Sequence, residues 1–201
     1  AYGELNLDNN GKAPESLTVV NVEWEAADAN GDKMQFKLEA QKLGADEPYL
    51  PLEDEIDVAS YAWDTRTMPE GRYRLRLVAT DGPDNTPEQA LDARRVSAPI
   101  LVDNSPPAID PFKAEADAAG KVRITARIKD AWSVVRDVRY AVNGAKQWQA
   151  VLPADRIYDS TTETVSFTIP DLAPGRAVIA LRAIDAQGNS RYVSTPVDVP
   201  E

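Results

Sequence analysis

Aspartate and asparagine residues in short loop segments are the side chains of this sequence best suited to chemistry. Asp28, Asn30 and Asp32 alternate in one such segment, with the first three spacings of a calcium-binding loop. Glu39 falls at the twelfth position of that pattern. Lys33, however, occupies the position that requires glycine, and no helix pattern flanks the loop, so a helix–loop–helix calcium site is not predicted. A turn between two strands, which an Asn-Gly pair suits, is the simpler interpretation.

Carboxylates are also the main acid–base groups that the chain offers for catalysis. It contains no histidine and no cysteine, so a serine nucleophile would lack its usual partner, and disulfides and thiolate metal sites are excluded. A glycosidase-like pair of carboxylates would define a small enzyme, provided that the pair converges in a real pocket. We expect the chain not to be an enzyme, because its carboxylates are spread over loops.

Net charge is distributed unevenly along the 201 residues. The total is −11, with 10 basic and 21 acidic residues through Asp103 and 12 of each from Asn104 onward. Neither half has the basic surface that phosphate binding requires, so we expect no nucleic-acid partner. The acidic excess suits a solvated surface, and an oxygen-rich cation site is the sharper alternative. No stretch approaches the ~18 apolar residues of a membrane-spanning helix, so we expect no membrane insertion.

An internal repeat positions these loops. Segment 63–81 contains a tight turn followed by a strand in which apolar residues alternate with arginines, and segment 167–185 has a similar pattern of turn and alternation. Equivalent residues of the two segments, such as Gly71 and Gly175, are separated by a constant offset of 104. A repeat of that length indicates duplicated domains of about 100 residues each.

Alternation with a period of two predicts short antiparallel strands in both halves. In the first half we expect a strand around Trp24, which would anchor the core, and an acidic loop over residues 43–57. In the second half, residues 122–129 alternate strictly, and Asn143-Gly144 predicts a hairpin turn. The 15 prolines and the absence of long helix-period runs favour the same all-β class.

Two copies of about seven short strands resemble tandem bacterial fibronectin type III and related immunoglobulin-like modules. The resemblance covers nearly the whole chain and implies two tandem antiparallel β-sandwiches joined by a short proline-containing linker. It also implies a place in the C-terminal tail of a large secreted or periplasmic protein. The motifs that carry it are Trp24 with the loop 28–32, Trp63-Asp64-Thr65, residues 69–75, the joint 102–107, Asn143-Gly144 with Trp148, Pro174-Gly175, Arg182-Ala183 and residues 185–189.

This resemblance sets the expected domain organisation. Residues 1–12 would be the end of a preceding module or a linker, and 13–103 a fibronectin type III-like sandwich. Residues 104–107 would be the linker, and 108–201 a second fibronectin type III/Ig-like sandwich. Such pairs often follow a β-propeller, which makes a preceding propeller an expected partner within the parent chain.

The family topology places two loops of each sandwich at the pole where its chain enters. Aspartates and asparagines would gather there near each joint, and their oxygens suit calcium. Cadherin-like proteins stiffen their joints in this way, by analogy. The alternative is that these side chains hydrogen-bond within their own loops. The candidate calcium ligands are Asp28, Asn30, Asp32, Asp81, Asp103, Asn104, Asp130 and Asp185.

Trp132 lies in a loop, off the alternating pattern. It is expected to pack against the first domain and fix the angle between the modules, or to present an exposed aromatic ring to a sugar or protein ligand. Ordinary packing within its own domain is the third interpretation.

The leading functional hypothesis is a non-catalytic structural or interaction module. It would act as spacer, docking tail or adhesive segment of a larger extracytoplasmic bacterial protein, whether secreted, periplasmic or at the cell surface. The alternative is a pair of carbohydrate-binding accessory domains of a polysaccharide-active enzyme, which requires at least two coplanar exposed aromatics. The fold alone does not name the protein or polysaccharide ligand. Calcium is an addition to the first hypothesis, and no other cofactor is expected.

Overall fold

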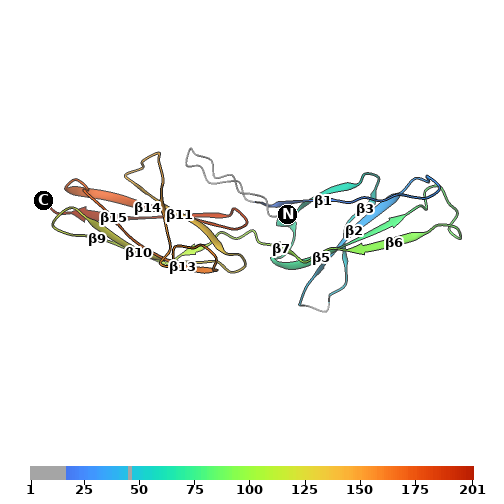
Figure 1. Cartoon of the computed structure of the whole chain (residues 1–201), viewed down its shortest axis with the longest axis horizontal. Helices are drawn as coiled ribbons and strands as arrows, with labels where there is room; N and C mark the ends of the chain where they lie inside the picture. The colour runs from blue at the N-terminus through green and yellow to red at the C-terminus, as the bar shows by residue number, and fades with distance from the viewer. Residues whose placement is uncertain (1–16, 45–46) are drawn as a thin grey trace. The chain divides into compact units, whose positions relative to one another are not determined.

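The computed structural model describes residues 17–44 and 47–201. They form two compact units, each of which is described by itself: an N-terminal unit, Thr18–Asp103, and a C-terminal unit, Asn104–Glu201 together with Leu17. The module end expected over residues 1–12 lies outside the described residues. Both units consist of paired antiparallel strands (Figure 1), which confirms the predicted all-β fold of two sandwiches.

Two sheets build the N-terminal unit. The smaller one pairs β1 with β4, and the larger one has the strand order β3-β2-β5-β6, with β7 also paired to β5. The elements are β1 (Val19–Glu23), β2 (Gln35–Lys42), β3 (Leu50–Ile56), β4 (Ser60–Asp64), the 3-10 turn η1 (Thr65–Thr67), β5 (Gly71–Thr80), β6 (Asp92–Val96) and β7 (Ile100–Val102).

The core of this unit lies between the two sheets, because alternate side chains of each strand point inward. In β2, Phe36, Leu38 and Ala40 are buried, as the alternation predicts, and Trp63 of the opposite sheet is also buried. Trp24 follows β1 and packs edge-on against Phe36, with ring centroids 5.3 Å apart, but it stays half-buried. Trp63 rather than Trp24 is therefore the tryptophan at the centre of the core.

The acidic segment 43–57 contains a strand where the sequence predicts a loop. β3 covers Leu50–Ile56 and pairs with β2 at the edge of the larger sheet. The loop prediction was wrong because pairing with β2 makes Leu50–Ile56 a strand, whereas its place at the edge is the one to which Pro51 restricts such a segment. The pairing between β2 and β3 is irregular, because the register shifts along the two strands.

A buried tyrosine fixes the turn that precedes β5. The hydroxyl of Tyr73 donates a 2.6 Å hydrogen bond to the carbonyl oxygen of Pro69. Its ring packs edge-on against Trp63, with centroids 5.8 Å apart. Burial raises the pKa of Tyr73, so the hydroxyl keeps the proton that it donates.

The C-terminal unit has the same two-sheet plan. One sheet has the order β13-β10-β8, with β9 also paired to β10, and the other has the order β12-β11-β14-β15. The strands are β8 (Ala108–Ile109), β9 (Lys113–Ala116), β10 (Val122–Lys129), β11 (Val135–Val142), β12 (Gln149–Val151), β13 (Thr162–Ile169), β14 (Gly175–Asp185) and β15 (Ser190–Val199).

Strict alternation in β10 produces the core of this unit. Val122, Ile124 and Ile128 are fully buried and pack in one cluster with residues of β14 from the opposite sheet. The predicted hairpin turn is confirmed at Asn143-Gly144, where φ is 50° and 71°. Positive φ at both central residues gives a tight turn at the end of β11, closed by a 2.9 Å hydrogen bond from the N–H of Ala145 to the carbonyl of Val142, and β12 follows at Gln149.

Candidate functional site

Three aspartates of the N-terminal unit, Asp28, Asp32 and Asp81, form what we call the acidic cluster. One carboxylate oxygen from each lies within 4.8 Å of the other two. Asp28 and Asp32 precede β2, whereas Asp81 directly follows β5. Because β2 and β5 are antiparallel neighbours, the start of one strand meets the end of the other. This pairing brings together residues that are far apart in the sequence.

The loop between β1 and β2 is folded around Asp28. Its Oδ1 accepts hydrogen bonds from the backbone N–H groups of Asp32, at 3.1 Å, and Asn30, at 2.8 Å. These hydrogen bonds lower the pKa of Asp28, and the bond from Asp32 has the largest effect. The carboxylate is therefore ionised at neutral pH while it organises its own loop.

Asp81 is the buried member of the acidic cluster, with 6% of its surface exposed. Its Oδ1 accepts a 2.6 Å hydrogen bond from the backbone N–H of Leu91. The side-chain amide of Asn85 donates to Oδ2 of Asp32 and to the backbone carbonyl of Asp81, both at 3.1 Å. Asn85 thus ties the two loops together.

The acidic cluster offers three hard oxygen ligands beside the start of β2 and the end of β5, and oxygen is the donor type that calcium takes from proteins. The ammonium group of nearby Lys33 pairs with Asp57 at 3.5 Å, outside the cluster. A bound cation would offset the mutual repulsion of the carboxylates, with backbone or water oxygens completing its 6–8 ligands. Asn30 is exposed on the same loop.

Asp130 and Asp185, two predicted ligands of the C-terminal unit, make hydrogen bonds within their own loops. Asp185 is fully buried; its Oδ1 accepts the N–H groups of Gln187 and Asn189 at 2.8 Å, and its Oδ2 accepts the Asn189 amide at 2.9 Å. Oδ1 of Asp130 accepts the N–H of Ser133 at 2.7 Å. These contacts are the loop bonds that the sequence allowed as an alternative to metal ligation.

Asp103 and Asn104 lie at the boundary between the two units in the sequence. Asp103 ends the N-terminal unit and is buried, and Asn104 begins the main segment of the C-terminal unit. Within single units, the structure brings together Asp28, Asp32 and Asp81 in the N-terminal unit and Asp130 and Asp185 in the C-terminal unit, with one carboxylate oxygen of each within 4.8 Å of its neighbours.

Trp132 occupies the loop between β10 and β11. The residue is 41% exposed, and its backbone N–H donates to Oδ1 of Asp130 at 2.8 Å. The ring thus presents a large part of its surface outside the core of its own unit.

A network around Arg182 in the C-terminal unit was not predicted. Arg182 is 1% exposed, and its guanidinium carbon lies 5.3 Å from the ring centroid of Trp148. Its Nη2 lies 3.7 Å from Oδ2 of Asp137. Alternation assigns Arg182 to the outer face of β14, where a side chain is normally solvated. The ring of Trp148 lies over its guanidinium, and a contact of this kind with a loop leaves no periodic signal in the sequence.

The aromatic pair beside Arg182 is perpendicular rather than coplanar. Trp148 and Tyr192 meet at 72°, with centroids 5.7 Å apart, and Tyr192 is 52% exposed. Trp63 is buried in its core. This pair therefore lacks the flat two-ring platform that the carbohydrate-binding hypothesis requires.

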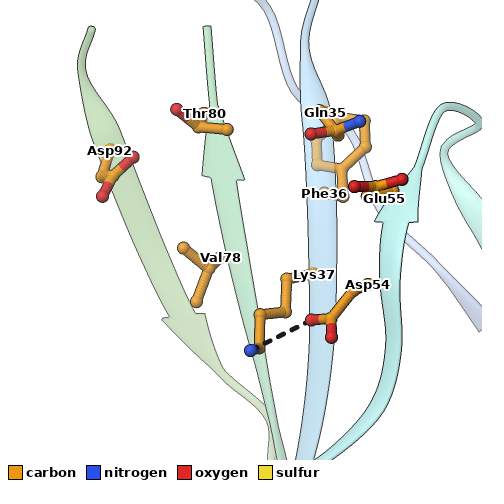
Figure 2. A pocket seen from close by; sticks show the side chains of 8 residues that line it. All are labelled: Gln35, Phe36, Lys37, Asp54, Glu55, Val78, Thr80 and Asp92. Atoms are coloured by element: carbon orange, nitrogen blue, oxygen red, sulfur yellow. Dashed lines mark ion pairs between the residues drawn. The ribbon is translucent and has the colours of Figure 1, made fainter. Parts of the chain in front are cut away.

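A surface hollow of about 310 Å³ lies on the larger sheet of the N-terminal unit. Figure 2 shows Asp92 of β6 on one side and Asp54 of β3 on the other, with β5 and β2 between them. Three strand spacings set the backbones that carry the two carboxylates roughly 14 Å apart, beyond the ~5 to 10 Å between the carboxylates of glycosidase pairs. Asp54 is also paired with Lys37, whose ammonium lies 3.0 Å from Oδ1.

No family model and no curated protein matches the chain. Among solved structures, it resembles the FN1–FN3 domains of chicken CNTN1, with 13% identity, a TM-score of 0.38 and coverage of 92% of this chain and 61% of that one. The chain thus spans less than two thirds of that structure.

Fibronectin(III)-like modules of Clostridium thermocellum CbhA are also similar, with 15% identity, a TM-score of 0.42 and coverage of 92% and 87% of the two chains. Dimeric latent PorU from Porphyromonas gingivalis has 16% identity and a TM-score of 0.41, with coverage of 92% and 22%. Fibronectin type III domains are thus among the structural neighbours, and the likeness concerns the fold alone.

Membrane-spanning helices were sought in residues 17–44 and 47–201, and no helix there is long and apolar enough to cross a bilayer.

Proposed function

We propose that the chain is a non-catalytic structural or interaction module, acting as spacer, docking tail or adhesive segment of a larger extracytoplasmic bacterial protein. The observation that supports this proposal is that carboxylates of the chain accept hydrogen bonds that hold its turns and strands. Four carboxyl groups, Asp28, Glu39, Asp64 and Asp117, have pKa values lowered chiefly by hydrogen bonds from backbone N–H groups or from arginine. A general acid would need the opposite displacement.

Asp64 illustrates the structural use of these carboxylates. Its side chain accepts hydrogen bonds from the guanidinium of Arg66, at 2.6 and 2.9 Å, and from the backbone N–H of the same residue, at 3.0 Å. Those bonds lower the pKa of Asp64 to about 2. The group holds the turn after β4 and has no proton to deliver near neutral pH.

The test is a turnover assay of the full chain against chromogenic glycosides and esters, beside a heat-denatured sample. We expect the rate to equal the buffer background. A rate above background that disappears in Asp92→Asn or Asp54→Asn would contradict the module proposal, because it would place catalysis in the hollow of Figure 2.

Carbohydrate binding is tested separately by electrophoresis of the full chain in gels that contain soluble polysaccharides. We expect unchanged mobility, since the rings of Trp148 and Tyr192 are perpendicular. Retardation that is lost in Tyr192→Ala would instead favour the accessory-domain alternative.

Calcium binding at the acidic cluster is a second, structural candidate function. The observation that favours it is the approach of three carboxylates from two loops, with oxygens within 4.8 Å and Asp81 buried. A cation held by Asp28, Asp32 and Asp81 would link the loop before β2 to the end of β5. It would therefore stabilise the N-terminal unit.

Thermal unfolding in millimolar calcium and in excess chelator tests this candidate. Binding to the folded state alone stabilises by about 2.7 kcal/mol at a hundredfold excess over the dissociation constant. We expect calcium to raise the Tm of the parent chain and of Asp198→Asn, an exposed charge control in β15, but not that of Asp81→Asn. Coincident curves for the parent chain would discard the metal site.

A further inference from the structure

Two Asn-Gly pairs lie in the described residues, and the proposed module role uses neither of them: Asn30-Gly31 and Asn143-Gly144. In such a pair the backbone nitrogen of glycine can attack the side-chain carbonyl carbon of asparagine, because glycine has no Cβ to obstruct the approach. The new C–N bond closes a succinimide ring, and the side-chain nitrogen leaves as ammonia. Solvent water then opens the ring at either carbonyl and yields aspartate or isoaspartate.

Hydrogen bonds in the folded chain protect Asn143 from this reaction. Its backbone N–H donates to the carbonyl oxygen of Val178 at 2.9 Å, and its Oδ1 accepts the N–H of Val178 at 2.8 Å. Both ends of the residue are therefore fixed to β14. The side chain must give up its bond to Val178 before its carbonyl carbon can turn toward the nitrogen of Gly144.

Asn30 is free of such a restraint. Its side chain is exposed, and among the described residues it makes no side-chain hydrogen bond. The N–H of Gly31 reaches its backbone acceptor, the carbonyl of Asp28, only at 3.4 Å. A Cβ placed on Gly31 or on Gly144 would meet nothing within 4 Å, so the two sites differ in their hydrogen bonds and not in the space beside glycine.

We propose that Asn30 is a self-modification site, which converts to aspartate and isoaspartate in the folded protein while Asn143 is protected. The aspartate product places a further carboxylate between Asp28 and Asp32, beside the acidic cluster. The isoaspartate product lengthens the backbone by one methylene within the loop that donates two N–H groups to Asp28. The modification thus changes both the charge and the geometry of this loop.

Peptide mapping by mass spectrometry of the full chain, incubated at mildly alkaline pH, tests the proposal. In the folded chain we expect Asn30 to convert about tenfold faster than Asn143, since one hydrogen bond must break at Asn143. In urea-unfolded chain we expect similar rates at both sites, because each is an Asn-Gly pair without structure. Equal rates in the folded chain would overturn the proposal.

Asn30→Gln is the matched variant, because it keeps the amide but requires a larger ring for the same attack. It should abolish conversion at position 30 and leave the rate at Asn143 unchanged. Folding should slow conversion at Asn143 more than at Asn30. If folding slows conversion equally at both sites, the proposal is wrong. None of these measurements depends on calcium binding.

Discussion

Two buried polar side chains, those of Asp185 and Tyr73, find hydrogen-bond partners close by in the chain. Asp185 binds the N–H groups of its own loop, and the hydroxyl of Tyr73 binds the carbonyl of Pro69. A buried polar group without a partner costs about 1–3 kcal/mol, so these local bonds are what allow the loops to pack against the cores. Individual residues therefore stabilise turns, and the turns position the strands.

Tyr73→Phe is expected to lower the free energy of unfolding of the N-terminal unit by about 1 kcal/mol, because the carbonyl of Pro69 loses its donor while the buried ring remains. Urea titration of the full chain measures the change. Tyr61→Phe is the control: its hydroxyl makes no hydrogen bond among the described residues, and it should change stability by less than about 0.5 kcal/mol. Equal effects of the two variants would show that the hydroxyl of Tyr73 does not stabilise the turn.

Cross-strand ion pairs act at the level of the elements. Glu39 of β2 lies opposite Arg76 of β5, and Nε of Arg76 donates to Oε2 of Glu39 at 2.6 Å. The guanidinium carbon of Arg76 also lies 3.9 Å from the ring centroid of Tyr49. The hydrogen bond from Arg76 is the first cause that lowers the pKa of Glu39 from 4.5. The two central strands are thus joined by a charged pair as well as by backbone bonds.

Glu39→Gln is expected to lower stability at neutral pH but not in acid. The pKa of Glu39 is lower in the folded chain than in the unfolded chain, so its contribution is present above about pH 4.5. It is lost as the pH falls through the folded-state value, where the carboxylate becomes protonated. Urea titrations over a pH series should therefore show parent and variant converging below pH 4.5, with exposed Glu88→Gln as the control. A constant difference at every pH would contradict this role for the charge.

Two glycines at turns of the C-terminal unit have similar backbone angles but different surroundings. Gly120 has φ +73° and Gly144 has φ +71°. A Cβ at Gly120 would lie 2.8 Å from the carbonyl oxygen of Leu172, whereas a Cβ at Gly144 would meet nothing within 4 Å. Gly144→Ala should therefore cost about 1 kcal/mol for the backbone conformation alone, and Gly120→Ala clearly more. Urea titration compares the free energies of unfolding of the two variants. Equal losses would show that the loop at Leu172 moves to make room for the added methyl group.

At the scale of the whole molecule, each unit has its own hydrophobic core. Leu38 belongs to the core of the N-terminal unit, and Ile124 to that of the C-terminal unit. Both side chains are essentially inaccessible to solvent. Two cores on one chain allow each unit to fold around its own pair of sheets, as expected of modules in a larger protein.

Leu38→Ala and Ile124→Ala should each lower the stability of one unit by about 2–5 kcal/mol. Hydrogen exchange of the full chain, read separately on β2 and β10 peptides, distinguishes the two. We expect each variant to speed exchange in its own unit and to leave the other unit close to the parent chain. Equal acceleration in both units by either variant would show that the chain unfolds as one cooperative body.

The sequence by itself determined the class and the scale of this protein. Period-two alternation, as in β10, specifies strands locally, because successive side chains point to opposite faces of a sheet. The turn at Asn143-Gly144 is specified just as locally, through residues that tolerate positive φ. The offset of 104 between repeated motifs indicated the two domain-sized units.

Tertiary structure alone decided the details that depend on pairing between distant strands. The resemblance placed Asp28, Asp32 and Asp81 at one pole, but their separation is set by the register of β2 against β5. Pairing with β2 likewise makes a strand of Leu50–Ile56, and packing beneath Trp148 buries Arg182. These features arise from contacts between segments far apart in sequence, and local periodicity carries no information about such contacts.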